Sequence, residues 1–503
     1  MNAPTPTDQA LAHHMAAIVG FFDQLAKSPP TDQAHEQQLF TDVFLPAFAA
    51  YCEHGSPAVA LDIEQLVYLN YVKRWEAESH FRVTYDALVP LLRRVAERAA
   101  PDLARVHQRQ VAAPARKEGD PPLVFFVIHV ESGLAHIQSL LRYLESMREF
   151  GADLLPLQPV VVTLDGADPG LRQRLKALQV PLVALGDLEP RRANAYIKLI
   201  KFAALCHDHQ PQAIVFVSLV MWMASFFAAR LAQTQVWWAM KYHAFSSPDI
   251  DGYMCGSPDG QPRTLGGNQW ETSPFGGSDW FAPELRAEAA AVKQRLGPWK
   301  TVFGSIGREE KLRDPAFLDA VCGVLEANPE SVFLWTGSRQ DGVIQSFFEG
   351  RGLEERTRFI GWVNTRLYAQ VIDVYLDSFP FPGGYTVYEA MAARRPVVMM
   401  KLAYPSVGLQ NNASPYYFAA DTADGVSADV QALFRKADGP LYYPVAESRD
   451  DYISYASRFA RDPALHAEVG RINAEFVERF MSNRQGMADG YHRALHKFIR
   501  QTQ

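Results

Sequence analysis

LDSFPFPGGYTVYEAMAARRPVV, residues 376–398, combines an apolar strand, a turn with two glycines and the start of an amphipathic helix. We expect the strand to end at Pro380 and the helix to begin near Tyr385. The unpaired N–H groups and the positive dipole end of a helix N-terminus attract anions. Gly383 and Gly384 would let the backbone approach such an anion closely. The alternative interpretation is an ordinary strand–turn–helix with a glycine turn.

Two side chains in this stretch add to the anion site. Thr386 can donate a hydroxyl hydrogen bond in the first turn of the helix. Glu389 lies one turn further on and can accept hydrogen bonds from ribose hydroxyls. The acidic residue favours a nucleotide over an ordinary turn, because phosphate and ribose would then have separate partners.

A second motif, VFGSIGREEKLRDPAFL at 302–318, opens from a strand into a charged loop at the same sheet edge. Arg308 and Lys311 in this loop can hold a diphosphate and stabilise the charge that develops as it leaves. The alternative is a solvated loop whose charges alternate in sign. The loop LWTGSR, 334–339, adds Gly337 as a weaker candidate for contact with the base or phosphate.

The wider chain alternates short apolar strands with helices in two series. Runs that are apolar at every position are typical of parallel strands buried on both faces. The first series of predicted strands is LVFFVIHV (123–130), PVVVTL (159–164), PLVALG (181–186), AIVFVSLV (213–220) and VWWAMKY (236–242). The second series is TVFGSIG (301–307), SVFLWTG (331–337), RFIGW (358–362), VYLDSFP (374–380) and PVVMM (396–400). We therefore predict two Rossmann-like, doubly wound α/β domains, at 120–285 and 298–450, that face each other across a cleft.

Helices are expected at both ends of the chain. Residues 1–115 form a predicted all-α module, and residues 451–503 form predicted C-terminal helices. We expect Pro90 to open one helix, and the stretch 111–122 to be a linker. Two apolar stripes at helical spacing support the module: Ile63, Leu66, Val67 and Tyr71, then Leu88, Leu91, Leu92 and Val95.

Composition excludes several classes of function. The 503 residues carry a net charge of −7, so nucleic acid is a poor partner. Four widely spaced cysteines argue against a disulfide framework or a cysteine zinc site and favour a cytoplasmic location. The uncharged stretch 213–229 is interpreted as a buried strand and core helix, not a transmembrane segment, and no signal peptide is expected.

The region 302–400 resembles the donor domain of the O-GlcNAc transferase superfamily, which includes bacterial enzymes that glucosylate high-molecular-weight adhesins. Its lysine motif, K-[IL]-x-[DN]-P, matches residues 311–315, KLRDP. Its phosphate turn and ribose acid match Asp377, Gly383, Tyr385, Thr386 and Glu389. The chain departs from the pattern at Tyr385, which replaces a hydroxyl residue, and at Glu389, where Asp is frequent. The resemblance implies the two-domain GT-B fold and a UDP-sugar donor.

The same stretch is also similar to a large retaining glycosyltransferase family with an E-x7-E motif. Glu389 would be the second glutamate, but the first falls on Phe381. A phenylalanine cannot act as a carboxylate, so the inverting superfamily is favoured.

The first α/β domain offers candidates for the acceptor side of the cleft. His129 and His136 follow its opening strand, and either can act as the base that removes the acceptor proton, although a structural role is the alternative. The segment KYHAFSSPDID, 241–251, adds Lys241 and His243, which match the family's pattern only approximately.

We therefore expect an inverting glycosyltransferase that moves a hexose or N-acetylhexosamine from a UDP-sugar. The resemblance implies a protein acceptor, a serine/threonine or asparagine side chain. The one D-x-D triplet, Asp249–Asp251, is interpreted as part of a turn, so no metal is expected, and no cofactor is needed because the UDP-sugar is a substrate. The alternatives are a transferase for lipid-linked or capsular glycans, a UDP-sugar 2-epimerase, and a non-catalytic partner protein. The oligomeric state is not predicted.

Overall fold

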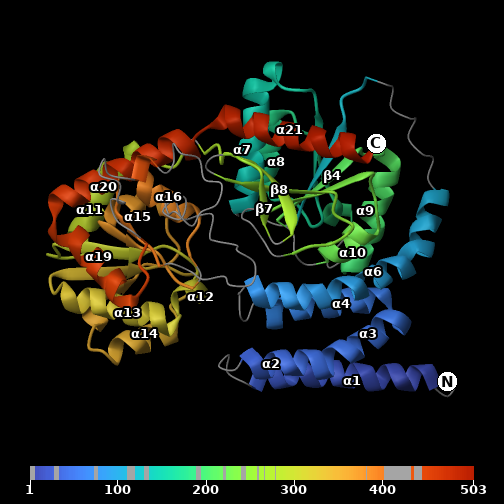
Figure 1. Cartoon of the computed structure of the whole chain (residues 1–503), viewed down its shortest axis with the longest axis horizontal. Helices are drawn as coiled ribbons and strands as arrows, with labels where there is room; N and C mark the ends of the chain where they lie inside the picture. Colours follow the sequence, from blue (N-terminus) through green and yellow to red (C-terminus); the bar gives the residue numbers. More distant parts are fainter. Residues whose placement is uncertain are drawn as a thin grey trace.

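The computed structural model, drawn in Figure 1, describes most of the chain. The described residues are 6–27, 33–72, 78–109, 119–129, 135–188, 194–218, 222–239, 245–257, 260–265, 267–277, 279–380, 382–400, 432–434 and 445–503. The predicted linker 111–122 lies largely outside them, since only 119–122 are described.

The N-terminal part is helical, as predicted. Its elements are α1 (Pro6–Lys27), α2 (Gln33–Leu39), η1 (Phe40–Phe44), α3 (Leu45–His54), α4 (Pro57–Val67), η2 (Tyr68–Val72) and α6 (Glu78–Arg109). The prediction that Pro90 opens a helix is wrong, because Pro90 lies inside α6. Pro90 is exposed, whereas Leu88 and Leu92 beside it are buried, so packing of the apolar stripe outweighs the lost hydrogen bond. Leu66 is exposed rather than part of the buried stripe.

The first sheet has eight strands in the order β3-β2-β1-β4-β5-β6-β8-β7. All neighbours pair in parallel except β7 and β8. The strands are β1 (Leu123–Ile128), β2 (Gln158–Thr163), β3 (Leu182–Ala184), β4 (Ala213–Val217), β5 (Thr234–Trp238), β6 (Gly252–Gly256), β7 (Arg263–Leu265) and β8 (Asn268–Ser273). Strands β1–β5 were predicted; β6–β8 were not, because they are short and rich in glycine or polar residues.

Helices cover both faces of this sheet. They are α7 (Ala135–Phe150), α8 (Pro169–Leu178), α9 (Ala195–His209) and α10 (Met223–Ala228), with the 3₁₀ turns η3 (Gly151–Asp153) and η4 (Leu185–Leu188). The stretch 213–229 is a buried strand and core helix, as predicted. No helix in the described ranges has the length and apolarity that a membrane crossing requires. One buried cluster runs from Phe21 in α1 through Leu88 in α6 to Trp237 in β5, so the helical module and this sheet share a core.

The second sheet has five parallel strands in the order β11-β10-β9-β12-β13. They are β9 (Thr301–Ser305), β10 (Ser331–Trp335), β11 (Thr357–Phe359), β12 (Val374–Leu376) and β13 (Val397–Val398). The helices are α11 (Arg286–Arg295), α12 (Glu309–Leu312), α13 (Pro315–Ala327), α14 (Gly342–Glu349), α15 (Thr365–Val371) and α16 (Tyr385–Ala392), with η5 (Pro283–Leu285) and η6 (Glu354–Arg356). The predicted strand end at Pro380 is wrong: β12 ends at Leu376, because Asp377 turns its side chain to Gly383.

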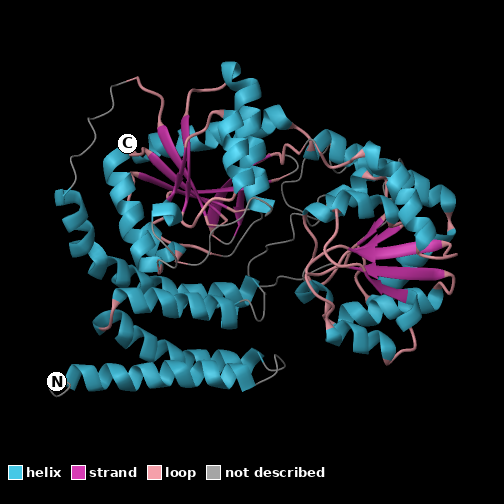
Figure 2. Ribbon diagram, turned by 180° about the vertical axis from the view of Figure 1, so that it is seen from behind, coloured by secondary structure: helices cyan, strands magenta, loops and turns pink. Residues whose placement is uncertain are grey.

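The C-terminal tail is helical and serves both sheets (Figure 2). It comprises α19 (Arg449–Arg461), α20 (Pro463–Phe476), η7 (Val477–Met481) and α21 (Arg484–Thr502). Helices α19 and α20 pack on α13 and α16 beside the second sheet, whereas α21 packs on α7 and β8 of the first. The division into four domains stays a proposal. In it, the C-terminal helices pack on both α/β domains.

The chain crosses between the two sheets twice, and the two crossings are bonded to each other. The first passes through 274–285 and the second through 477–484. The carbonyl of Met481 accepts hydrogen bonds from the Gly277 N–H at 2.9 Å and from the Trp280 indole N–H at 3.2 Å. These bonds define a hinge region between the sheets.

Candidate functional site

Two loops at the carboxyl edge of the second sheet meet in front of α16. The Lys311 ammonium donates a hydrogen bond to the Pro382 carbonyl at 2.8 Å. Directly after it, the Gly383 N–H donates to the Asp377 carboxylate at 2.6 Å. The structure therefore brings a lysine and a glycine turn, separated by about seventy residues of chain, to the start of one helix.

The two glycines of this turn face different surroundings. A Cβ atom on Gly383 would lie 2.8 Å from an Asp377 carboxylate oxygen and 2.9 Å from Val387, so only glycine fits there without movement. A Cβ atom on Gly384 would have no protein atom within 4 Å. Space in front of Gly384, at the N-cap of α16, is thus open on the side where an anion would bind.

Asp377 anchors this turn and was not among the predicted site residues, although the family motif contains it. Its carboxylate is buried, and burial raises its pKa to about 7; the Gly383 N–H and the charge of Lys311 act in the opposite direction. The Tyr452 hydroxyl donates to the Asp377 backbone carbonyl at 2.8 Å. A carboxylate held in this way fixes the geometry of the turn.

The Thr386 hydroxyl is engaged within the protein. It lies 3.0 Å from the Tyr375 hydroxyl and donates to the Ile306 carbonyl at 3.1 Å. Tyr375 donates to the same carbonyl at 3.1 Å. Thr386 therefore ties the first turn of α16 to the loop that follows β9, where Arg308 and Lys311 lie.

The loop of the second motif, which follows β9, is fastened to the loop after β10 through Glu309. This buried carboxylate accepts hydrogen bonds from the Ser338 N–H at 2.8 Å and the Ser338 hydroxyl at 2.6 Å. A Cβ atom on Gly337 would lie 2.9 Å from the same carboxylate, which gives this glycine a packing role. Arg308, at the N-cap of α12, is exposed at the same edge.

Glu389 is the one acidic residue of the motif with an unused acceptor. One of its oxygens has no hydrogen-bond partner among the described residues and is buried. The carboxylate bonds to Thr365, and burial raises its pKa to about 7 against the opposing charges of Arg366 and Arg142. An unpaired buried oxygen lowers the stability of the folded protein unless a donor bonds to it. The Glu389 oxygen is therefore a suitable acceptor for a hydroxyl group of a ligand.

Sequence reasoning missed the loop beside Glu389. It treated RFIGW as a strand, but β11 ends at Phe359 and the following residues form the loop that leads into α15. Trp362 in this loop is 74% exposed, an unusual setting for an indole. An exposed aromatic ring at the carboxyl edge of a parallel sheet is the signal that could have drawn attention to it.

Tyr385, the first residue of α16, reaches the helices of the first sheet. Its hydroxyl contacts the Ser139 hydroxyl of α7, and its ring packs edge-on against Trp280 at 5.2 Å. The Arg142 guanidinium of α7 lies 5.1 Å from the same ring and pairs with Asp279 at 2.8 Å. The residue that departs from the family pattern thus joins the two halves of the molecule.

The two candidate bases lie at the carboxyl edge of the first sheet. His129 follows β1, with its ring 3.4 Å from Asp165, which also pairs with Lys198 at 2.5 Å. Burial lowers the pKa of His129, and burial together with the charge of His129 lowers the pKa of His136 to about 4. His136 is therefore neutral at pH 7, the form that can accept a proton.

Asp165 and Lys198, the neighbours of His129, were not predicted from the sequence. Lys241 and His243, predicted for the acceptor side, lie outside the described residues. Within the described part of the chain, no group of three or more histidine, cysteine or acidic residues could hold a metal ion. The four cysteines are free and buried.

Two helix-covered sheets, parallel except for the pair β7–β8 and linked by two chain crossings, are the arrangement of the GT-B fold, as the sequence predicted. The chain is similar to an O-GlcNAc transferase variant from Thermobaculum terrenum, with 17% identity over 97% of this chain and 98% of that one and a TM-score of 0.55. It is also similar to a glycosyltransferase from Rickettsia africae, with 10% identity over 76% of this chain and 99% of that one and a TM-score of 0.50. No family model and no curated protein matches the sequence.

Proposed function

We propose that this chain is an inverting glycosyltransferase that moves a hexose or N-acetylhexosamine from a UDP-sugar to a protein side chain, serine/threonine or asparagine. The observation that carries the proposal is the hydrogen bond from Lys311 to Pro382, which holds a cation beside the glycine turn and the start of α16. Anionic phosphates are stabilised at such a place by both the ammonium and the helix dipole.

In this proposal Arg308, Lys311 and the α16 N-terminus bind the diphosphate. As the bond from the anomeric carbon to UDP breaks, negative charge grows on the leaving phosphate, and a fixed cation stabilises that charge most in the transition state. The unpaired Glu389 oxygen supports a ribose contact. Gly337, Gly383, Gly384, Tyr385 and Thr386 shape the pocket.

On the acceptor side, His129 or His136 removes the acceptor proton; Lys241 and His243, which lie outside the described residues, are proposed for contact with the acceptor from the resemblance alone. The lowered pKa leaves both histidines unprotonated at pH 7, as a base must be before it acts, whereas a pKa of about 4 makes His136 a weak base. The proposal uses no metal and no cofactor, and it places the reaction in the cytoplasm, where free cysteines are usual. The protein acceptor rests on the resemblance and on the likeness to an O-GlcNAc transferase over 97% of this chain.

Release of UDP from UDP-glucose, UDP-galactose and UDP-GlcNAc tests the proposal. We expect the wild-type protein to release UDP from at least one donor, and Lys311→Ala to lower the turnover about a hundredfold or more. Lys300→Ala is the matched control, since Lys300 is an exposed lysine just before β9 that pairs with Glu330. We expect this control to keep wild-type turnover.

Three outcomes would contradict the proposal. Equal turnover in Lys311→Ala and wild type would remove Lys311 from the mechanism. Interconversion of UDP-sugars without transfer would indicate a 2-epimerase. A melting temperature that UDP does not raise would indicate a non-catalytic partner protein, because a ligand that binds only the folded form stabilises it. Mass spectrometry of the glycosylated product then separates protein from glycan acceptors.

A further inference from the structure

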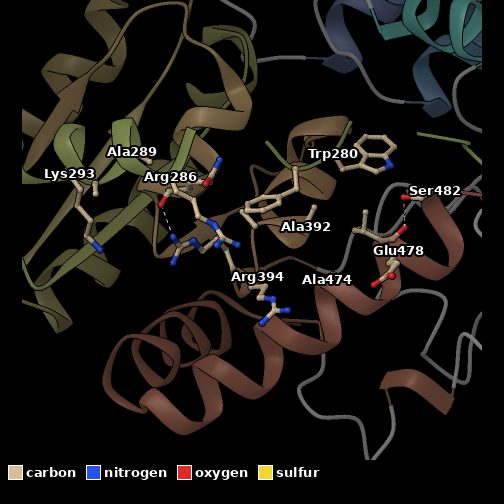
Figure 3. Close-up of a pocket in the computed structure, with 15 residues that line it drawn as sticks. Trp280, Arg286, Ala289, Lys293, Ala392, Arg394, Ala474, Glu478 and Ser482 are labelled. Carbon is tan, nitrogen blue, oxygen red and sulfur yellow. Dashed lines mark hydrogen bonds between the residues drawn. The ribbon is translucent and has the colours of Figure 1, made fainter. Parts of the chain in front are cut away.

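A second cavity lies at the hinge, away from the proposed nucleotide site. It has a volume of about 580 Å³ and is lined by α11, by the C-terminal end of α16 and by the second chain crossing (Figure 3). The predicted nucleotide-binding residues lie in the loops after β9 and β10 and between Gly383 and Glu389, and none of them lines this cavity. We call it the hinge pocket; its lining residues are Trp280, Phe281, Arg286, Ala289, Ala290, Lys293, Gln370, Ala392–Arg395, Ala474, Val477, Glu478 and Ser482.

The hinge pocket is strongly basic. Four cationic side chains line it, Arg286, Lys293, Arg394 and Arg395, against the single carboxylate of Glu478. The whole chain carries a net charge of −7, so this local excess of positive charge runs against its composition. A concave surface with one sign of charge concentrates ions of the opposite sign.

Two of these cations have their charge compensated by the protein. Lys293 pairs with Asp373 at 2.5 Å, and Arg395 lies 3.8 Å from the same carboxylate while donating to the Gln370 carbonyl at 2.6 Å. Arg395 nevertheless keeps one buried nitrogen, Nε, without a hydrogen-bond partner in the described part of the chain.

The other two cations, Arg286 and Arg394, are exposed and have no carboxylate partner within the described ranges. In Figure 3 they lie between Lys293 on one side and Trp280 and Glu478 on the other. A guanidinium fork binds the oxygens of a phosphate or carboxylate through two hydrogen bonds. Between the cations, the lining is apolar: Ala289, Ala290, Ala392, Ala474 and Val477.

We propose that the hinge pocket is a second ligand site, for a small organic molecule with two or more phosphate or carboxylate groups. Arg286 and Arg394 would bind the anionic groups, and the apolar lining would contact the body of the ligand. The site is separate from the proposed donor site and does not depend on it.

The position of the pocket gives such a ligand a mechanical effect. Its lining comes from both chain crossings, Trp280 and Phe281 from the first and Val477, Glu478 and Ser482 from the second. A ligand that touches both would hold them together. Trp280 also packs against Tyr385 at the start of α16, so one side chain of the hinge pocket contacts one residue of the proposed donor site.

Binding of tripolyphosphate and of citrate to the full chain, measured by calorimetry without nucleotide, tests the proposal. UDP is left out because its two phosphate groups would compete for the hinge pocket; the double variant described next separates this pocket from the donor site, and the two probes distinguish phosphate from carboxylate ligands. We expect at least one probe to bind, and the double variant Arg286→Ala/Arg394→Ala to bind it at least tenfold more weakly. Arg295→Ala is the matched control, because Arg295 is an exposed arginine on the same helix outside the pocket. We expect it to bind as the wild type does.

Equal weakening in the double variant and in Arg295→Ala would mean diffuse attraction to surface charge and would overturn the proposal, as would no binding of either probe. If the double variant does not fold, the single variants Arg286→Gln and Arg394→Gln replace it. The product of their two reductions in probe affinity is then expected to be at least tenfold. The comparison with Arg295→Ala can be interpreted whether or not UDP binds. Failure of the proposed transferase activity therefore does not affect the test of the hinge pocket.

Discussion

Asp377 is a buried carboxyl group in the connection between β12 and α16, and Glu389 is a largely buried carboxyl group in α16 itself. Burial raises the pKa of each to about 7, because a carboxylate loses its hydration inside the protein. Asp377 recovers part of this loss through the Gly383 N–H, whereas Glu389 keeps one oxygen unpaired. Glu389 is therefore the residue whose charge a ligand can stabilise.

The raised pKa of Glu389 predicts a pH-dependent stability. A carboxyl group with a folded pKa of about 7 and an ordinary value of 4.5 holds its proton more tightly in the folded protein. Its stabilising contribution is full below pH 4.5 and is lost as the pH rises through 7, by at most about 3 kcal/mol. We expect the melting temperature to fall between pH 5 and pH 8, and to fall less steeply in Glu389→Gln.

Glu330→Gln is the control for this measurement, since Glu330 is an exposed carboxylate that pairs with Lys300. Its pH profile should match the wild type. Part of the slope should persist in Glu389→Gln, because the pKa of Asp377 is raised into the same range. Identical slopes in Glu389→Gln and the wild type would show that Glu389 does not titrate near neutrality.

At the scale of the element, the N-terminus of α16 depends on two adjacent glycines for different reasons. Gly383 gives room for Asp377, and Gly384 leaves room for a ligand. We expect Gly383→Ala to lower the free energy of unfolding by about 1–3 kcal/mol through overpacking. Gly384→Ala should cost less stability but weaken UDP binding at least tenfold, because its methyl group occupies the space in front of the helix.

Urea unfolding and calorimetry with UDP measure the two effects separately. The glycine pair is its own control, because both variants add the same methyl group one residue apart. If Gly384→Ala binds UDP as tightly as the wild type does, the phosphate lies elsewhere and the proposed geometry of the site is wrong.

The sequence predicted the elements that carry this site, but not the contacts that fasten them. Continuous apolar runs identified β9, β10 and β12, and the glycine turn identified the start of α16. The bonds of Thr386 to Ile306 and of Glu309 to Ser338 join residues far apart in the chain, which local pattern cannot reveal. For the same reason Gly337 was interpreted as a ligand contact, although its neighbour Glu309 already explains the glycine.

Local rules failed where tertiary packing outweighed them. Pro90 was expected to open a helix, but the buried stripe of α6 continues through it. Strands β6–β8 were missed because glycine and polar residues weaken their pattern; neighbouring strands supply the pairing that stabilises them.

At the scale of the whole molecule, α21 completes the first sheet from the far end of the chain. It buries Met487, Tyr491, Leu495, Phe498 and Ile499 against that sheet and α7. The Phe498 ring lies so close to β6 that a Cβ atom on Gly252 would be 2.6 Å away. The apolar surface covered by this helix belongs to strands that precede it by two hundred residues or more.

We therefore expect Phe498→Ala to lower the free energy of unfolding by about 3–5 kcal/mol, through lost burial and the cavity left behind. Arg500→Ala, an exposed change on the same helix, should stay within about 0.5 kcal/mol of the wild type. Urea unfolding followed by tryptophan fluorescence reports the difference, because Trp238 lies in the same cluster. A Phe498→Ala variant as stable as Arg500→Ala would show that α21 is dispensable for the core.

The return of α21 also constrains how the protein is made. The ribosome releases the strands of the first sheet two hundred residues or more before α21, the helix that shields one of their faces. Until α21 emerges, that apolar face has no permanent cover, and a growing chain in this condition is exposed to aggregation or to capture by chaperones. The first sheet is thus synthesised before the second, yet it cannot mature until the chain has passed through the second.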